Sequence, residues 1–312
     1  MHEHLTHAIY YLEIHLIFCS IVWLAAWALT SIPSASAATK HWIWLATALN
    51  FIVPFGAIID VVFGHDIPWA SPIGLVGGLG AYISDTTPIA LLLAALWLLG
   101  LAAMLARLCT RIVNERRLNQ TSGHTHASLP DRKFTADGIE VRIANTRRGP
   151  AVTGLLHAQI SLPVGIDRLL SDLELNSVLM HELTHARRRD NLIRLAYELA
   201  LCVLWFHPLV WITGSRLALY RELSCDENAI RNGLGRELLS ALGKLAQADE
   251  EPLLRATATS LLRHRLARLT EESSSRMSPR ANGLLYIGFA AVLVAGIFAT
   301  VAHTACCFIA RS

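Results

Sequence analysis

A short run that begins at His181 has the residue types and the spacing of a catalytic zinc site. The run reads His181-Glu182-Leu183-Thr184-His185, and on a helix two residues four positions apart lie on one face. The two imidazoles can therefore bind one Zn²⁺, while Glu182 can act as the general base on the water that the metal activates. The sequence predicts zinc-dependent hydrolysis, with one zinc ion per chain.

A third zinc ligand must come from another part of the chain, because a catalytic zinc keeps three protein ligands and one open position. Glu222 opens the run ELSCD and is the candidate. Asp226, one helical turn later, is expected to accept a hydrogen bond from the far nitrogen of a zinc-bound histidine. Cys225 competes with Glu222 as the third ligand, and His207 is an alternative ligand.

The zinc motif is predicted to lie inside a helix that begins at a capping box. Ser171 and Glu174 have the spacing of that motif, and an apolar periodic pattern runs from them through both histidines. Tyr197 and Tyr220 are candidates to stabilise a tetrahedral oxyanion, with packing in the core as the competing interpretation. The sequence leaves both roles open.

The composition is that of a membrane protein. Of 312 residues, 53% are hydrophobic and only 16% are charged. Four apolar segments are long enough to cross a bilayer. They are Ala8–Leu29, Trp42–Phe63, Ile89–Leu108 and Leu284–Ala302. The net charge of +3 is small and gives no reason to expect direct binding of nucleic acid. The six cysteines have no CxxC spacing, which favours small buried side chains in a reducing compartment.

The basic residues predict the orientation in a bacterial inner membrane. No Lys or Arg occurs in the N-terminal tail or in residues 64–87, whereas Arg107 and Arg111 follow the third segment and Arg280 precedes the fourth. Both termini are therefore expected outside, and residues 109–283 in the cytoplasm.

The predicted fold is an integral membrane, mainly α protein with about four transmembrane helices and a cytosolic α+β zinc-protease domain that contains a small sheet. Its expected parts are a three-helix transmembrane region (1–108), a linker (109–135), the protease domain (136–270), a flexible linker (271–282), the last transmembrane helix (283–304) and a short external tail (305–312).

Three short strands are predicted before the zinc helix, at Ile139–Ala144, Ala151–Thr153 and Ala158–Leu162. Zinc proteases often hold an extended substrate by strand addition at a sheet edge. His157–Pro163 immediately precedes the zinc helix and is the candidate edge strand. A strand that only braces the helix is the alternative.

The apolar stretch Leu192–Ile212 is interpreted as a helical hairpin rather than as a further crossing. A crossing would place Glu222 and His181 on opposite sides of the membrane, where they could not share one ion. The hairpin is expected to turn at His207-Pro208, because proline is tolerated in the first turn of a new helix. It lies in the core or dips into the bilayer.

Four blocks in this order resemble the BlaR/MecR-type membrane metallopeptidases, metallopeptidase family 56, which are gluzincins. They are Pro150–Pro163 (PAVTGLLHAQISLP), Leu170–Asn191 with the HELTHARRRDN run, Trp205–Trp211 (WFHPLVW) and Arg221–Glu227 (RELSCDE). The resemblance implies transmembrane helices with a cytosolic gluzincin domain between the third and the last. By motif it also implies zinc at His181, His185 and Glu222, with Glu182 catalytic and Asp226 supporting.

The resemblance implies a protease that transmits a signal, with antibiotic-resistance regulation as the setting in that family. The expected substrate is a cytoplasmic winged-helix repressor, with cleavage of the chain itself in 271–282 as a second event. Only 305–312 follow the last predicted span, where the antibiotic receptors carry a penicillin-binding sensor domain. The signal is therefore expected to come either from a separate sensor protein or from the short outer loops. The alternatives are an HtpX-type membrane quality-control protease and a catalytically silent receptor or scaffold. The sequence also leaves open whether the protein forms a homodimer.

Overall fold

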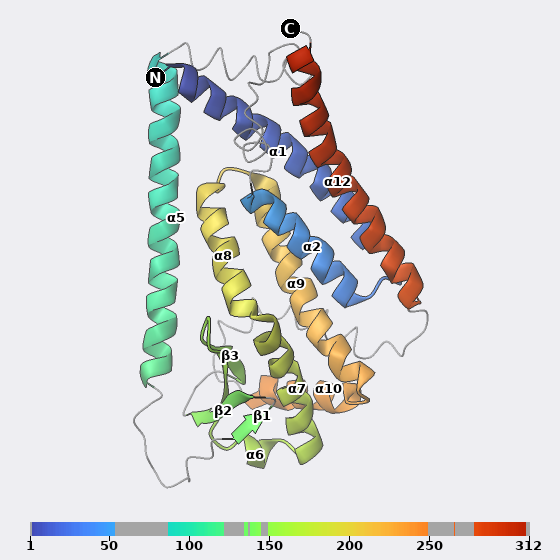
Figure 1. The fold of residues 1–312 in the computed structure, drawn as a ribbon. Coiled ribbons are helices and arrows are strands. Elements are labelled where there is room, and N and C mark those ends of the chain that lie inside the picture. Colours follow the sequence, from blue (N-terminus) through green and yellow to red (C-terminus); the bar gives the residue numbers. More distant parts are fainter. Residues whose placement is uncertain are drawn as a thin grey trace. The chain divides into compact units, whose positions relative to one another are not determined.

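The computed structural model describes residues 2–53, 87–121, 134–136, 138–144, 149–248, 265 and 278–309. The described part is mainly helical with one small sheet (Figure 1). It divides into two compact units, each described here by itself. The first comprises Met1–Leu105, Ala200–Leu217 and Met277–Ser312, and the second comprises Ala106–Leu199 and Ala218–Arg276.

Three helices of the first unit pack against one another: α1 (His2–Thr30), α2 (Ala37–Ile52) and α12 (Pro279–Ile309). Helix α2 begins at Ser36, whose side chain accepts from a backbone N–H in the first turn. The backbone N–H of Ser36 itself donates to Asn282 Oδ1 at 3.0 Å, which joins α2 to α12. Helix α2 ends at Ile52 because Val53 is extended, as expected for a residue that precedes proline.

Two of the described helices are long and apolar enough to cross a membrane. They are Leu91–Glu115 within α5 (Thr87–Thr121), with a mean hydropathy of 2.2, and Pro279–Gly296 within α12, with 1.2. Most side chains of both windows are exposed, as lipid-facing side chains would be. The predicted span Trp42–Phe63 lies partly outside the described residues. Four crossings therefore remain a prediction.

Helix α5 continues past its predicted end at residue 108 and into the predicted linker. The sequence has no Gly or Pro from Arg107 to Thr121 to end the helix. A charge cluster in the second unit also holds this part of α5 against α8 (Asp190–Val203). In that cluster Arg111 donates to both oxygens of Glu198, and Arg194 donates to Glu198 and Glu115.

The sheet lies in the second unit and contains β1 (Phe134–Ala136), β2 (Ile139–Ala144), β3 (Ala151–Thr153) and β4 (Gln159–Pro163) in the order β1-β2-β4-β3. The three predicted strands are confirmed, the third shifted by one residue. The pairs β1–β2 and β3–β4 are antiparallel, and β2–β4 is parallel.

The sheet order corrects the predicted substrate-binding edge. Strand β4, within His157–Pro163, pairs on both sides and is an interior strand, so the edge prediction is wrong. The two edge strands of the described sheet are β1 and β3, and β3 is the one that pairs with β4. Pairing between strands is set by contacts distant in sequence, which the order of strands along the chain does not reveal.

Helix α7 (Asp172–Arg188) carries the zinc motif and begins at the predicted capping box, which is confirmed at Ser171 and Glu174. Glu174 also accepts from Ser240 Oγ at 2.6 Å and Lys244 Nζ at 2.7 Å of α10 (Gly235–Ala248). These donors, with the Ser171 backbone N–H, lower the pKa of Glu174 to about 2. The start of α7 is thereby fixed to α10.

A core beneath α7 sets the position of the helix. It contains Val141 and Ile160 of the sheet, Val178 of α7 and Leu238 of α10, all buried. The short helix α6 (Ile166–Leu169) connects β4 to α7. Because the sheet, α7 and α10 share this core, the zinc motif rests on rigid elements.

The helix that carries Glu222, α9, runs from Pro208 to Arg231. Helix α8 ends at Val203, and a turn over residues 204–207 joins it to α9, with His207 N–H donating to Leu204 O at 2.9 Å. The predicted turn at His207-Pro208 is thus confirmed, with proline at the first helical position.

We expect Gly154→Ala to destabilise the β3–β4 connection more than Gly138→Ala destabilises the β1–β2 turn. Both glycines have positive φ, 86° and 78°, so both substitutions cost about 1–2 kcal/mol in backbone strain. A Cβ on Gly154 would also lie 2.1 Å from His157 O, whereas one on Gly138 meets no atom within 4 Å. The clash adds roughly 1–3 kcal/mol.

Thermal unfolding of the detergent-solubilised protein measures the difference. Gly154→Ala should unfold at the lower temperature of the two. Equal unfolding temperatures would show that the tight connection into β4 is not as described.

Candidate metal centre

Helix α7 places the two histidines of the motif side by side in the interior. Their Nε2 atoms lie 3.1 Å apart, and the exposed fraction of His181 is only 5%. Glu182, the next residue, is also buried and lines the same cavity. The i and i+4 spacing therefore gives the shared face that the sequence predicts.

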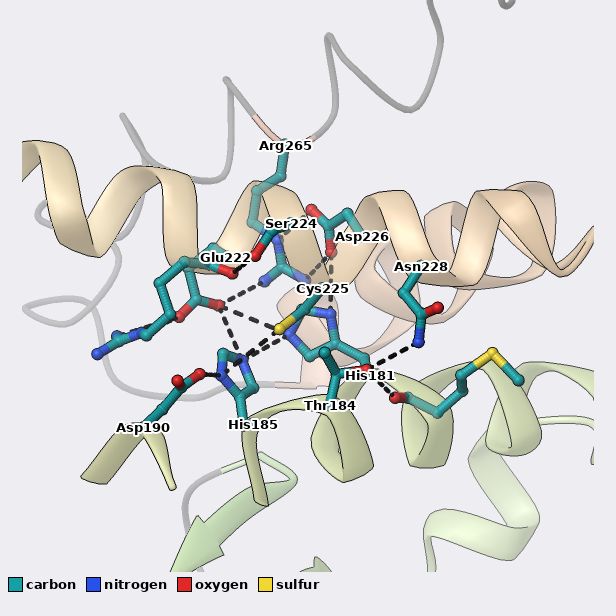
Figure 2. A network of polar contacts seen from close by, with 12 residues as sticks. His181, Thr184, His185, Asp190, Glu222, Ser224, Cys225, Asp226, Asn228 and Arg265 are labelled. Atoms are coloured by element: carbon teal, nitrogen blue, oxygen red, sulfur yellow. Dashed lines mark hydrogen bonds and ion pairs between the residues drawn. The ribbon is translucent and has the colours of Figure 1, made fainter. Parts of the chain in front are cut away.

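Glu222 of α9 completes a triangle of donor atoms. Its Oε2 lies 3.6 Å from His181 Nε2 and 3.6 Å from His185 Nε2 (Figure 2). Tetrahedral coordination with bonds of about 2.0–2.2 Å requires donor atoms about 3.3–3.6 Å apart. Two neutral imidazoles and one carboxylate at these separations fit a zinc ion.

Each histidine has a carboxylate beside its other ring nitrogen. His181 Nδ1 lies 3.0 Å from Asp226 Oδ1, a short charge contact without the alignment of a hydrogen bond. His185 Nδ1 lies 2.6 Å from Asp190 Oδ2, and Figure 2 draws this contact as a dashed line. A carboxylate at the far nitrogen fixes the tautomer and the orientation of a metal-binding imidazole.

The two aspartates are in turn held by arginines. Arg265 Nε and Nη2 each donate to one oxygen of Asp226, both at 2.8 Å. Arg188 Nη2 donates to Asp190 Oδ2 at 2.6 Å. Buried carboxylates are stable only when they are paired, so these arginines permit the two aspartates to lie inside the protein.

Asp190 and Arg265 were not predicted as site residues. The structure explains the position of Asp190: Arg189, which ends α7, adopts a left-handed conformation with φ of 55°, so the chain turns between α7 and α8. Asp190 then opens α8 next to His185. No local pattern relates Arg265 to Asp226, because their contact is distant in sequence.

Contacts between α7 and α9 fix the distance from the histidines to Glu222. Arg188 donates to Ser224 Oγ and, at 3.3 Å, to the backbone carbonyl of Arg221. Asn228 Nδ2 donates to Thr184 Oγ1 at 2.9 Å. These bonds lie on either side of His185 along α7 and of Glu222 along α9.

Cys225 offers a competing donor set. Together with His181 and His185 it forms a group whose donor atoms lie close enough for one metal ion. The thiol is fully buried, and burial raises its pKa. Its Sγ lies 3.6 Å from His185 Nδ1, the nitrogen that Asp190 already contacts, and 3.1 Å from Arg188 Nη2.

The ionisation of these groups is strongly coupled. Burial lowers the pKa of His181, but Asp226 and Glu222 outweigh burial and raise it above its ordinary value. Burial also lowers the pKa of His185, but Asp190 and Glu222 outweigh burial and raise this pKa well above its ordinary value. Burial raises the pKa of Glu222, whereas the two histidines hold it well below its usual range. A metal ion must therefore displace protons from the imidazoles.

The histidines and Glu222 border a cavity of about 390 Å³. Apolar side chains of α7 and α10 form one part of the lining, and three arginines form another. The apolar side chains are Val178, Leu238, Leu242 and Leu245, and the arginines are Arg194, Arg221 and Arg265. Strand β3 contributes Ala151 and Val152. Tyr197 and Tyr220 are buried but do not belong to this lining, and neither does His207.

The sequence comparison places this site in a known family. A profile of the family described as BlaR1 peptidase M56 matches residues 80–269, more than half of the chain. The chain belongs to this family. The resemblance predicted from the four blocks is confirmed, and the matched region contains both helices that carry the site. Together with the two apolar helices, this identifies a membrane-associated M56 peptidase.

Two curated relatives illustrate the similarity. The peptidase is 33% identical over 144 residues to Regulatory protein BlaR1 of Bacillus licheniformis, covering 42% of this chain and 23% of the relative. It is 26% identical over 99 residues to Methicillin resistance mecR1 protein of Staphylococcus aureus, covering 32% of this chain and 17% of the relative. The matched regions thus span less than a quarter of each relative.

We expect Asp190→Asn to weaken zinc binding by about 10–100-fold, because the amide leaves His185 without its charged partner. Asp172→Asn is the matched control, since Asp172 is an exposed residue in the first turn of the same helix. Competition with a chromophoric chelator measures both affinities. Equal zinc affinity in the two variants would show that Asp190 has no part in metal binding.

Proposed function

We propose that this M56 peptidase is a membrane-bound zinc endopeptidase in which His181, His185 and Glu222 hold the metal and Glu182 is the general base. The observation that carries the proposal is the convergence of three buried donor atoms from α7 and α9 at separations of 3.1 and 3.6 Å. Glu182 borders the same cavity.

Glu222 is a better third ligand than Cys225 because of the nitrogens that each one faces. Glu222 Oε2 faces both Nε2 atoms, which lie together. Cys225 approaches His185 from the Nδ1 side, where Asp190 is the closer partner. The raised pKa of the Cys225 thiol also disfavours the thiolate that a metal requires.

Bound zinc would lower the pKa of a water molecule to about 7 and polarise a substrate carbonyl. The residues of the chain supply the remaining steps. Glu182 accepts a proton from the attacking water as its oxygen adds to the peptide carbonyl carbon. When the C–N bond breaks, Glu182 passes that proton to the leaving amine, so the products are a carboxylic acid and an amine.

An extended substrate is proposed to bind along β3, which replaces the edge predicted at His157–Pro163. Val152 of β3 lines the cavity, and its carbonyl accepts from Asn191 Nδ2 at 2.9 Å. This carbonyl therefore has a partner in α8, outside the sheet. Backbone groups on the outer side of an edge strand are the ones that strand addition uses. Asn191 would have to yield or rearrange when a substrate strand pairs with β3.

The physiological role is proposed to be signal transmission by proteolysis. The support is the family and the relatives, one of which is called a regulatory protein. The proposed substrate is a cytoplasmic winged-helix repressor, with self-cleavage within 271–282, a stretch rich in Ser and Glu. Residues 271–277 lie outside the described residues, and α12 begins at Pro279, so the predicted linker ends earlier than residue 282. A cytoplasmic protease domain and external termini complete this proposal.

Two kinds of substitution should separate metal binding from hydrolysis. His181→Ala and Glu222→Ala should lose the metal, because each removes one of three ligands. Glu182→Gln should keep about one zinc per chain and lose hydrolysis, because Glu182 acts on the water rather than on the ion. Cys225→Ser is the control and should keep both properties.

Metal analysis of the purified variants, together with cleavage of a casein-type protein substrate, measures both properties. Full zinc occupancy in Glu222→Ala would show that the third ligand is Cys225, Asp226 or Glu227 instead of Glu222.

Self-cleavage should release a fragment of about 30 kDa that lacks the last predicted span, compared with 34.3 kDa for the chain. Membranes with the wild-type protein should contain this fragment under an inducing condition, and membranes with Glu182→Gln should not. Immunoblotting with a tag at the N terminus measures it. The same fragment in both strains would assign the cleavage to another protease, whereas its absence under every stimulus would favour the quality-control alternative.

A further inference from the structure

Arg265 is a charged residue at the cavity that neither the zinc motif nor the general base accounts for. Only 13% of its side chain is exposed, and it lines the cavity beside Glu222. Arginine is seldom buried unless each part of its guanidinium has a partner. Nε and Nη2 bond to Asp226, whereas Nη1 has no hydrogen-bond partner among the residues that the structure describes.

One side of the Arg265 guanidinium is fixed by Asp226. Nε donates to Oδ2 and Nη2 donates to Oδ1, both at 2.8 Å, which is the bidentate geometry that arginine and carboxylate prefer. This pair orients the plane of the guanidinium. It also holds the pKa of Arg265 above its usual range, so the charge is permanent.

The remaining nitrogen, Nη1, faces the metal-binding positions. Its nearest carboxylate oxygen among the described residues is Glu222 Oε2, at 3.9 Å, which is beyond hydrogen-bond range. That same oxygen lies 3.6 Å from both imidazole Nε2 atoms. Figure 2 shows the guanidinium between Glu222 and Asp226. Nη1 therefore borders the space where the three donor atoms converge.

The other two cavity arginines are less suited to contact a substrate there. Arg221 directs two nitrogens to Glu222 Oε1, at 3.1 and 3.2 Å, and neutralises that carboxylate. Arg194 bonds to Glu115 and Glu198, and 39% of its side chain is exposed. Arg265 combines burial, a fixed orientation and an N–H edge directed to the cavity.

We propose that Arg265 is a catalytic residue that binds the substrate carbonyl oxygen through Nη1 and stabilises the oxyanion formed when water attacks. This inference rests on the proposed function and assigns to Arg265 the role that the sequence suggested for Tyr197 and Tyr220. As the carbonyl oxygen gains negative charge, a positioned N–H donor of permanent charge bonds to it more strongly. Arg265 therefore stabilises the transition state more than it stabilises the bound substrate. No electron or proton leaves Arg265.

Arg265→Gln tests the role, because glutamine is neutral and cannot form the bidentate pair. At saturating zinc, Arg265→Gln should still hold about one zinc per chain, although its zinc affinity falls because Asp226 loses its bidentate partner. Binding of a phosphinic peptide, whose tetrahedral anion resembles the oxyanion intermediate, should weaken by about 100-fold. A hydroxamate peptide of the same sequence, which binds chiefly through the metal, should bind about as well as before. Isothermal titration calorimetry measures both peptides without any need for turnover.

Matched variants separate the outcomes. Arg168→Gln removes one charge from an exposed position on α6 and should leave both peptide affinities unchanged. If Arg265→Gln does not fold, Arg265→Lys replaces it: lysine cannot contact Asp226 and the cavity at once, so phosphinic-peptide affinity should still fall by about tenfold or more.

The proposal is overturned if Arg265→Gln, or Arg265→Lys in its place, binds the phosphinic peptide as the wild type does. It is also overturned if, at saturating zinc, the phosphinic and hydroxamate peptides weaken by the same factor, because Arg265 would then act only through Asp226 and His181. Failure of the wild-type protein to bind zinc would instead contradict the proposed function. The two failures are therefore distinguishable.

Discussion

The approach of α7 to α9 is the constraint on which the rest of the site depends. Arg188, near the end of α7, makes much of this contact, because its guanidinium bonds to Ser224 and to the Arg221 carbonyl on α9. The same guanidinium bonds to Asp190, which contacts His185. One side chain thus determines both where Glu222 lies and how one histidine is oriented. A short displacement of either helix would separate the donor atoms.

Charge balance is the second requirement of this interior. Glu222, Asp190 and Asp226 are carboxylates in or beside a largely buried site, and each has an arginine partner: Arg221, Arg188 and Arg265, respectively. An isolated buried carboxylate would instead take up a proton. Three arginines keep the carboxylates ionised, and ionised carboxylates attract and orient the two imidazoles. A divalent ion would enter a site whose acceptors are already charged.

The sequence predicts the local elements of this site well, because their signals are local. The capping box at Ser171 locates the start of α7, and the proline of His207-Pro208 locates the start of α9. The strands at Ile139–Ala144 and Ala151–Thr153 follow from β-branched residues between turn signals. Each of these predictions depends on residues within a few positions of one another.

The features that the sequence does not predict are contacts between distant residues. The interior position of β4 depends on pairing with both β2 and β3, and the residues of a strand do not indicate which strands pair with it. The bond from Arg265 to Asp226 joins two residues 39 positions apart that no local pattern relates. The extension of α5 also depends on partners in α8, since Arg111 and Glu198 lie far apart in sequence.

The identity of the third metal ligand is the central claim, and X-ray absorption spectroscopy at the zinc edge of the metal-loaded protein tests it most directly. The account predicts a first coordination shell of nitrogen and oxygen alone, at about 2.0–2.2 Å, with the multiple-scattering signature of two imidazoles from His181 and His185. A sulfur scatterer at about 2.3 Å would contradict it, because Cys225 would then hold the ion in place of Glu222.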